Sequence, residues 1–230
     1  MLERVIVEPK QNKQKVTHVV IWLHGLGADG HDFEAIVPEL TLPQNAGIRF
    51  IFPHAPVQPV TINMGMKMRA WYDIKRIDDI KRDVDCKGIE ESLSALDEII
   101  QAELSRGIAV ENIIIAGFSQ GGAIAALAGL TMAYKFAGIV SLSTYLPDWD
   151  YFKQKLTLTN KNTPFFIGHG TEDSVVPLAA GELLNNTLQQ QGITTCFHRY
   201  TMEHSVCMPE IKDISRFIQL CFRLINDTAN

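Results

Sequence analysis

The chain has 230 residues, of which 46% are hydrophobic, so a packed globular core is expected and a disordered protein is excluded. Its formal net charge is −5 and it has no lysine or arginine run, which makes nucleic acid an unexpected partner. No apolar run approaches the roughly 20 residues that span a bilayer, and no signal-peptide pattern is found, so we expect a cytoplasmic protein without stable membrane insertion.

The predicted elements alternate between strands and helices along the chain. Short apolar runs predict buried strands over 19–23, 49–52, 137–142 and 164–167, and two further strands are predicted over 112–116 and 195–200. Apolar residues at helical spacing predict helices over 87–106, 120–134 and 177–191, and a closing helix whose face is marked by Ile211, Ile214, Ile218, Cys221 and Ile225. This alternation predicts an α/β fold, with a mostly parallel central sheet and helices on both faces. No linker divides it, so 1–230 is expected to form a single domain.

Residues 54–85 do not fit the alternation, and we interpret them as a long loop insertion near the active site. Long loops in compact domains are usually functional or disordered. The first half of this segment contains Met64, Met66, Met68 and Trp71 and is too apolar for an idle solvated loop. Plain core packing of these side chains is the alternative.

Four cysteines lie far apart in the sequence and form no C-x-x-C pair. They are Cys86, Cys196, Cys207 and Cys221. This spacing argues against a zinc site and a small disulfide scaffold, and it favours free thiols. Cys207, which is close to a histidine discussed below, has a role that stays open.

The segment Gly117-Phe118-Ser119-Gln120-Gly121 has the pattern G-x-S-x-G between a predicted strand and a predicted helix. This is the pattern of a nucleophile elbow, in which a strained turn exposes a serine hydroxyl above the sheet. The alternative is a tight turn that needs glycine for packing only. The buried strand before it and the small-residue helix after it favour the nucleophile.

A nucleophilic serine needs a base, and the base needs a carboxylate to orient it. Three histidines follow Ser119, and His204 is preferred because it lies in a loop after the last strand, at the carboxyl edge of the sheet. His169 and His198 are expected to be satisfied structural histidines. Glu172 and Asp173 both qualify as the carboxylate by position.

An oxyanion hole needs two backbone donors. The amide of Gln120 starts a helix, where partial positive charge favours an anion. The second donor should come from the glycine-rich loop after the first strand, where Leu26 is the best candidate. An ordinary glycine-rich surface turn is the alternative.

The chain resembles the acyl-protein thioesterase, or phospholipase/carboxylesterase, family of α/β-hydrolases, and looks like a bacterial-type member. The matching stretches are WLHGLGADGHDF at 22–33, FPHAP at 52–56, PVTINMGMKMRAWYDI at 59–74, GFSQGGA at 117–123, LSTYLP at 142–147, GHGTEDSVVP at 168–177 and HSVCMPEI at 204–211. The 59–74 block is much more specific than G-x-S-x-G, because general α/β-hydrolases do not share it.

The resemblance implies a triad of Ser119, Asp173 and His204, and it favours Asp173 over Glu172. It also implies an oxyanion hole from the Leu26 and Gln120 amides, and neither a metal nor an organic cofactor. The side chains that it suggests for an acyl-binding groove are those of the 64–71 region, namely Met64, Gly65, Met66, Met68 and Trp71. Flexible thioethers suit acyl chains of varied shape.

The expected function is therefore that of a serine hydrolase that cleaves esters or thioesters of acyl chains through an acyl-serine intermediate. The substrate is a small ester, a lysophospholipid or an acylated protein, and the sequence does not separate these. Other α/β-hydrolase chemistry, such as peptidase or lactone hydrolase activity, and a non-catalytic binding protein are the alternatives. A monomer or a homodimer and transient membrane contact are all compatible with the sequence.

Overall fold

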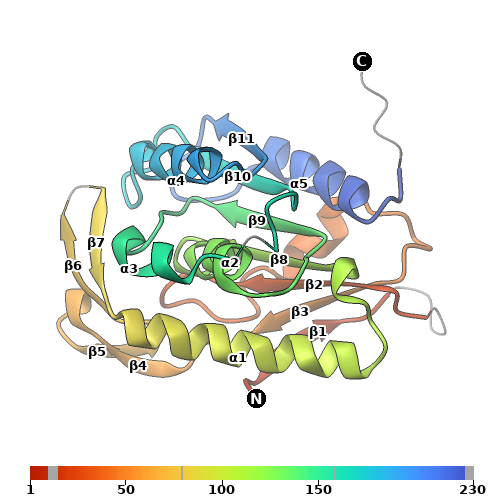
Figure 1. Ribbon diagram of the computed structural model, residues 1–230, viewed down its shortest axis with the longest axis horizontal. Coiled ribbons are helices and arrows are strands. Elements are labelled where there is room, and N and C mark those ends of the chain that lie inside the picture. The colour runs from red at the N-terminus through yellow and green to blue at the C-terminus, as the bar shows by residue number, and fades with distance from the viewer. Residues whose placement is uncertain (10–14, 79, 158, 226–230) are drawn as a thin grey trace.

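The computed structural model describes residues 1–9, 15–78, 80–157 and 159–225, which are built around one seven-stranded sheet (Figure 1). The strand order is β1-β3-β2-β8-β9-β10-β11. The strands are β1 (Arg4–Val7), β2 (His18–Leu23), β3 (Ile48–Pro53), β8 (Ile113–Phe118), β9 (Gly138–Leu142), β10 (Phe165–Gly170) and β11 (Thr195–Tyr200). All neighbours pair in parallel except β1, which is antiparallel to β3. The predicted α/β fold with a mostly parallel sheet is confirmed.

Two features of the sheet differ from the prediction. Strand β1 was not predicted, because four residues that pair only with the edge strand β3 carry too short a pattern to be recognised. Strand β10 continues beyond 167 through Gly168, His169 and Gly170. These glycines sit where the sheet is crowded, since a Cβ on Gly170 would lie 2.3 Å from the carbonyl oxygen of Met202.

The helices follow the predicted order. They are α1 (Cys86–Ser105), α2 (Gln120–Thr131), α3 (Trp149–Phe152), α4 (Leu178–Gln190) and α5 (Met208–Cys221), with a 3₁₀ helix η1 (Glu34–Leu40). The placement of Ile225 on the face of the closing helix was wrong, because α5 ends at Cys221 and Ile225 is 38% exposed. Arg223 has a φ of 55°, and the Leu224 amide donates to the Gln219 carbonyl, which is the Schellman arrangement that ends a helix.

The sheet has a hydrophobic core on each face. Alternate residues of β2 face opposite sides, with Val19, Ile21 and Leu23 in one core and Val20 and Trp22 in the other. The first core is covered by α1, α2 and α4, and the second by η1 and α5. Among the described helices, none is both long and apolar enough to cross a membrane.

The segment 54–85 was predicted as a long loop, and this was wrong. It forms two antiparallel hairpins, β4 (Val57–Val60) with β5 (Met66–Arg69), and β6 (Ile74–Asp78) with β7 (Lys81–Val84). Both lie at one end of the molecule, beside the start of α1 (Figure 1). A two-stranded ribbon exposes much of both faces, so these strands lack the apolar run that marks a buried strand.

Candidate active site

Ser119 occupies a strained turn between β8 and α2. Its backbone has φ 53° and ψ −119°, and its amide donates to the Leu142 carbonyl at 2.8 Å, which holds the turn against the neighbouring strand. The flanking glycines are required by space. A Cβ on Gly117 would lie 2.2 Å from the Gly121 carbonyl oxygen, and a Cβ on Gly121 would lie 2.3 Å from that of Leu23. The turn therefore presents the serine at the carboxyl edge of the sheet.

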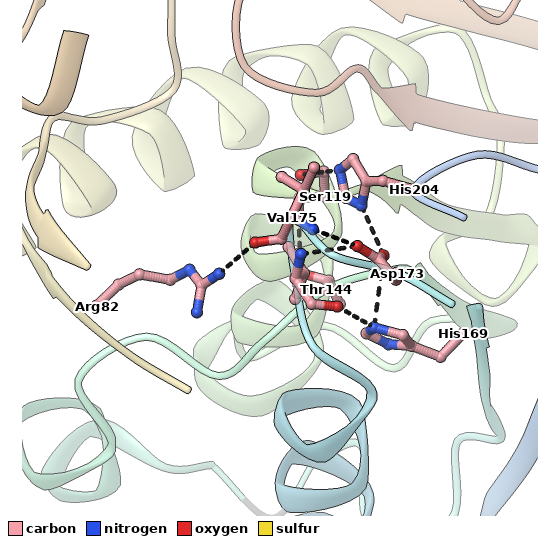
Figure 2. Close-up of polar contacts among 8 residues, drawn as sticks. Arg82, Ser119, Thr144, His169, Asp173, Val175 and His204 are labelled. Atoms are coloured by element: carbon pink, nitrogen blue, oxygen red, sulfur yellow. Dashed lines mark hydrogen bonds and ion pairs between the residues drawn. The ribbon is translucent and has the colours of Figure 1, made fainter. Parts of the chain in front are cut away.

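The structure brings Ser119, His204 and Asp173 into one hydrogen-bonded row (Figure 2). His204 lies in the loop between β11 and α5, and its Nε2 is 3.0 Å from the Ser119 Oγ. Its Nδ1 is 2.7 Å from Oδ2 of Asp173, which lies in the loop after β10. In this arrangement Nδ1–H donates to the carboxylate, so that Nε2 is free to accept the serine proton.

Both carboxylate oxygens of Asp173 are occupied. Oδ1 accepts from the amides of Val175 at 2.9 Å and Val176 at 2.7 Å, while Oδ2 faces His204. Burial acts to raise the pKa of Asp173, but the hydrogen bonds from His204 and these two amides outweigh burial and lower it below its usual value. Glu172 is exposed, and the carboxylate that bonds His204 Nδ1 is that of Asp173.

The other two histidines do not reach Ser119. His169 is fully buried at the end of β10, where its Nε2 donates to the Val176 carbonyl at 2.8 Å and lies 3.7 Å from Asp173 Oδ2. Burial lowers the pKa of His169, against the opposing effect of that hydrogen bond. Its Nδ1 has no hydrogen-bond partner in the described part of the chain, so His169 is structural but not fully satisfied. His198 stacks on Phe166 with ring centroids 5.1 Å apart.

The loop that carries Leu26 is held in place by hydrogen bonds of the neutral side chain of His24. His24 donates from Nδ1 to the Gly25 carbonyl at 2.7 Å and accepts at Nε2 from the Ala55 amide at 3.0 Å. Burial lowers the pKa of His24 to about 4, which keeps it in the neutral form that this pair of bonds requires. Leu26 and Gln120 line the same cavity as Ser119.

Trp71 lies behind this loop rather than in a groove. It is 2% exposed, and its indole donates to the His24 carbonyl at 2.8 Å. The Gln120 side chain accepts from the Trp71 amide and donates to the Tyr72 carbonyl, both at 2.8 Å. The Gly27 amide donates to the Arg69 carbonyl at 2.8 Å. The 69–72 stretch thus supports both loops from which the oxyanion donors are expected.

The predicted substrate-binding residues do not line the cavity beside Ser119. Met64, Gly65, Met66, Met68 and Trp71 are all described by the structure, and none of them is on its wall. Met64 is 94% exposed and lies with Gly65 in the turn of the first hairpin, and Met66 is 58% exposed. Met68 accepts a hydrogen bond from the Asn63 side chain at 3.1 Å. These methionines belong to the first hairpin, and their part in binding an acyl chain stays a prediction.

The cavity beside Ser119 has a volume of about 250 Å³ and is mostly apolar. Its walls include residues that the sequence did not single out, namely Ile62, Ile74, Ile77, Arg82, Tyr145, Val175 and Val176. Four of these come from the 54–85 segment. Because this segment was predicted as a loop, the sequence did not show which of its side chains face the cavity. A second cavity of about 440 Å³ shares Asp32, Phe118 and His204 with the first.

The described residues offer no metal site, because no group of three or more His, Cys, Asp or Glu side chains lies close enough together to hold an ion. All four cysteines lie within the described ranges, and none of them forms a disulfide. Cys196 is exposed and the other three are half-buried, so none of the four occupies a fully buried position.

Comparison with known proteins gives one consistent family. The model of the phospholipase/carboxylesterase family matches residues 3–222. Acyl-protein thioesterase 1 of Yarrowia lipolytica is 38% identical over 209 residues, which cover 88% of this chain and 91% of the relative. The Neurospora crassa protein of the same name is 40% identical over 210 residues, with coverages of 88% and 86%. The solved structure of Arabidopsis thaliana SOBER1 aligns with a TM-score of 0.84 at 31% identity, covering 89% of this chain and 99% of that one.

Proposed function

Because the chain belongs to the phospholipase/carboxylesterase family of α/β-hydrolases, we propose that Ser119, His204 and Asp173 form its catalytic triad. The chain is a serine hydrolase of carboxylic esters or thioesters. The observation that carries the assignment is the row of two hydrogen bonds, 3.0 Å from Ser119 Oγ to His204 and 2.7 Å from His204 to Asp173.

In the first half of the reaction, His204 Nε2 takes the proton of Ser119 as Oγ attacks the substrate carbonyl. Asp173 keeps Nδ1 protonated and stabilises the imidazolium ion that forms. The tetrahedral intermediate collapses to an acyl-serine when Nε2–H gives its proton to the leaving alcohol or thiol. Water, activated by His204, then attacks the acyl-serine and releases the carboxylic acid.

The negative charge on the substrate oxygen would be stabilised by the backbone amides of Leu26 and Gln120. The Gln120 amide is the first of α2 and has no acceptor within the helix. The hydrogen bonds of His24 and Arg69 to the Leu26 loop keep that loop fixed before substrate arrives. By analogy with other serine hydrolases, each preorganised donor contributes roughly 3 kcal/mol to the stabilisation of the transition state.

The test of the nucleophile is the change Ser119→Ala. We expect this variant to lose labelling by a fluorophosphonate probe and to lower kcat by about 10⁶-fold, because no other group can form the acyl intermediate. Ser105→Ala, at the exposed end of α1, is the matched control and should label as the unchanged protein does. Persistent labelling of Ser119→Ala would overturn the assignment.

The acyl chain and head group are to be identified by a substrate panel. We propose that acyl esters or thioesters are cleaved, with acylated proteins among the candidates because the relatives at 38% and 40% identity are named acyl-protein thioesterase 1. p-Nitrophenyl esters from acetate to palmitate, run beside lysophospholipid, peptide and lactone substrates, would rank these classes. Turnover of peptides or lactones in preference to every ester would contradict the proposal.

A further inference from the structure

Arg82 is a buried cation that the proposed mechanism does not use. It lies on β7 and is 8% exposed, and its guanidinium carbon is 4.6 Å from the centre of the Tyr145 ring. Its two recorded hydrogen bonds go to backbone carbonyls, from Nη1 to Ile80 at 3.3 Å and from Nη2 to Val175 at 2.8 Å. No carboxylate among the described residues lies within ion-pair distance of it.

A buried charge without a counter-ion is costly, and buried charges in proteins are usually paired. A guanidinium has five N–H donors, and backbone carbonyls take two of those of Arg82. The group also lines the cavity that contains Ser119. Figure 2 shows it reaching the Val175 carbonyl from the side away from Ser119 and His204. The described residues supply no negative partner for this guanidinium, and an anion in the cavity would be one.

The two cavities that His204 lines can be assigned to the acyl group and the leaving group of an ester substrate. Ser119, Leu26 and Gln120 line the first cavity and not the second, so an acyl group held on the serine and the oxyanion donors belongs in the first. His204 lines both cavities and must protonate the leaving atom, so with the acyl group in the first cavity the leaving group is assigned to the second. Arg82 lines the first cavity and not the second, so it lies on the acyl side.

The walls between the nucleophile and Arg82 are suited to a methylene chain. Ile62, Ile74 and Ile77 supply apolar surface in the same cavity, and Tyr145 lies against the guanidinium. A substrate that fits both features has an apolar acyl chain ending in an anionic group. A carboxylate matches the planar guanidinium fork and can accept two parallel hydrogen bonds from it.

Resting on the proposed function, we propose that Arg82 is a specificity-determining residue that binds a carboxylate at the far end of the acyl chain. The substrates of this site then include monoesters and monothioesters of dicarboxylic acids. Ser119 attacks the ester carbonyl of such a substrate, and the distal carboxylate is bound by Arg82 and left chemically unchanged.

The test compares two esters that differ only in the charge at the end of the acyl chain. They are the p-nitrophenyl monoester of adipic acid and the neutral analogue that has a terminal carboxamide. Arg82→Met keeps an unbranched side chain over the apolar stem and removes the guanidinium charge, so it should lower the charged-to-neutral ratio of kcat/KM by about 10- to 100-fold. Arg82→Lys should give an intermediate ratio, because it keeps the charge and loses the fork.

The matched control is Arg76→Met, which removes an exposed arginine from the same hairpin and should leave the ratio unchanged. An equal ratio in Arg82→Met and in the unchanged protein, with normal hydrolysis of the neutral ester, would overturn the proposal and leave the proposed function intact. Failure of the unchanged protein to hydrolyse either ester would instead contradict the proposed function. Where Arg82→Met does not fold, Arg82→Lys decides, and an unchanged ratio there also overturns the proposal.

A second pair of substrates tests which side of the ester carries the anion. Lysophosphatidate and the matching monoacylglycerol differ by a phosphate on the leaving group, and their acyl chains are neutral. Arg82→Met should change this ratio no more than Arg76→Met does. A selective loss of lysophosphatidate hydrolysis in Arg82→Met, with the adipate ratio unchanged, would place the anion on the leaving-group side and overturn the acyl-side assignment.

Discussion

The two oxygens of Asp173 have separate partners, and this division fixes the geometry of the candidate triad. Oδ1 is held by the amides of Val175 and Val176, so Oδ2 is turned toward His204 Nδ1. An aspartate in this turn can form the two amide bonds with its own loop, as in an Asx turn. Glu172, one residue earlier, points to solvent and cannot replace it.

At this scale we expect Asp173→Asn to lower kcat by about 10⁴-fold with little change in substrate binding, because the amide would stabilise the wrong tautomer of His204. Glu172→Gln is the control one residue away and should retain full activity. Steady-state kinetics on p-nitrophenyl butyrate would measure both. A large loss in Glu172→Gln together with an active Asp173→Asn would mean that the carboxylate has been assigned wrongly.

The residues of the candidate triad could be located from sequence because each lies in a loop after a predicted strand, and parallel strands end at the same edge. The choice of Asp173 needed the family resemblance, since both acids occupy the same loop. The residues of the cavity wall could not be located in this way, and substrate binding by the 64–71 side chains stays a prediction. Met64 and Met66 have the composition of a groove, but whether a side chain faces a cavity depends on a hairpin register that an exposed ribbon does not encode.

At the scale of the elements, helix α2 is joined to the 54–85 segment by one side chain. Gln120 is 1% exposed and bonds the Trp71 amide and the Tyr72 carbonyl, which belong to the stretch between the two hairpins. Ser92 of α1 donates to the Trp71 carbonyl from the other side. The backbone of Gln120 can thus serve the oxyanion while its side chain holds the supporting segment.

We expect Gln120→Met to destabilise the fold by about 2–6 kcal/mol, because the Trp71 amide and Tyr72 carbonyl would each lose a buried partner at a cost of about 1–3 kcal/mol. The backbone donor remains, so fluorophosphonate labelling of the folded fraction should persist. Urea denaturation gives the stability. Gln101→Met, at an exposed site on α1, should change it by less than about 0.5 kcal/mol. Equal stability of the two variants would show that the side-chain link is unimportant.

The prediction of strands from the sequence is correct where a strand is buried on both faces and wrong where a strand is partly exposed. The strands β2, β8 and β9 are apolar runs because the sheet is covered on both faces, and sequence alone finds them. In β6, by contrast, one residue of five is buried, so neither an apolar run nor a clear alternation marks it. The hairpins could therefore not be predicted from the sequence, although their strands contribute Ile74, Ile77 and Arg82 to the cavity wall.

For the whole molecule, the contact between α5 and the sheet contains a buried acid. Glu210 is fully buried, and neither of its carboxyl oxygens has a hydrogen-bond partner in the described part of the protein. A Cβ on Gly168 of β10 would lie 2.1 Å from its Oε1, so the carboxyl group rests directly on the sheet. Burial, with a smaller effect of Asp213, raises the pKa of Glu210 to about 8.

This pKa has a defined consequence for global stability. The folded-state pKa lies above the unfolded value of 4.5, so the stabilising effect of the neutral form is complete below pH 4.5 and is lost as pH rises toward 8. Glu210→Gln should therefore gain in Tm relative to the unchanged protein as pH rises, by roughly 5–10 °C between pH 5 and pH 8. Thermal unfolding followed by circular dichroism would measure the difference.

The control for this prediction is Glu111→Gln, which changes an exposed glutamate and should shift Tm equally at every pH. A Tm difference for Glu210→Gln that stays constant from pH 5 to pH 8 would mean that Glu210 is already ionised in the folded protein.

The division of the molecule between triad loops and hairpins has a consequence for the exchange of parts between relatives. The proposed nucleophile, base and acid come from three loops far apart in the sequence, whereas four residues of the cavity wall come from one continuous segment, 54–85. Exchange of this one segment between relatives would therefore change those four wall residues together and leave the proposed triad in place. An exchanged segment would have to keep three hydrogen bonds to the rest of the chain. The Arg69 carbonyl accepts from the Gly27 amide, and the Trp71 amide and Tyr72 carbonyl bond the Gln120 side chain.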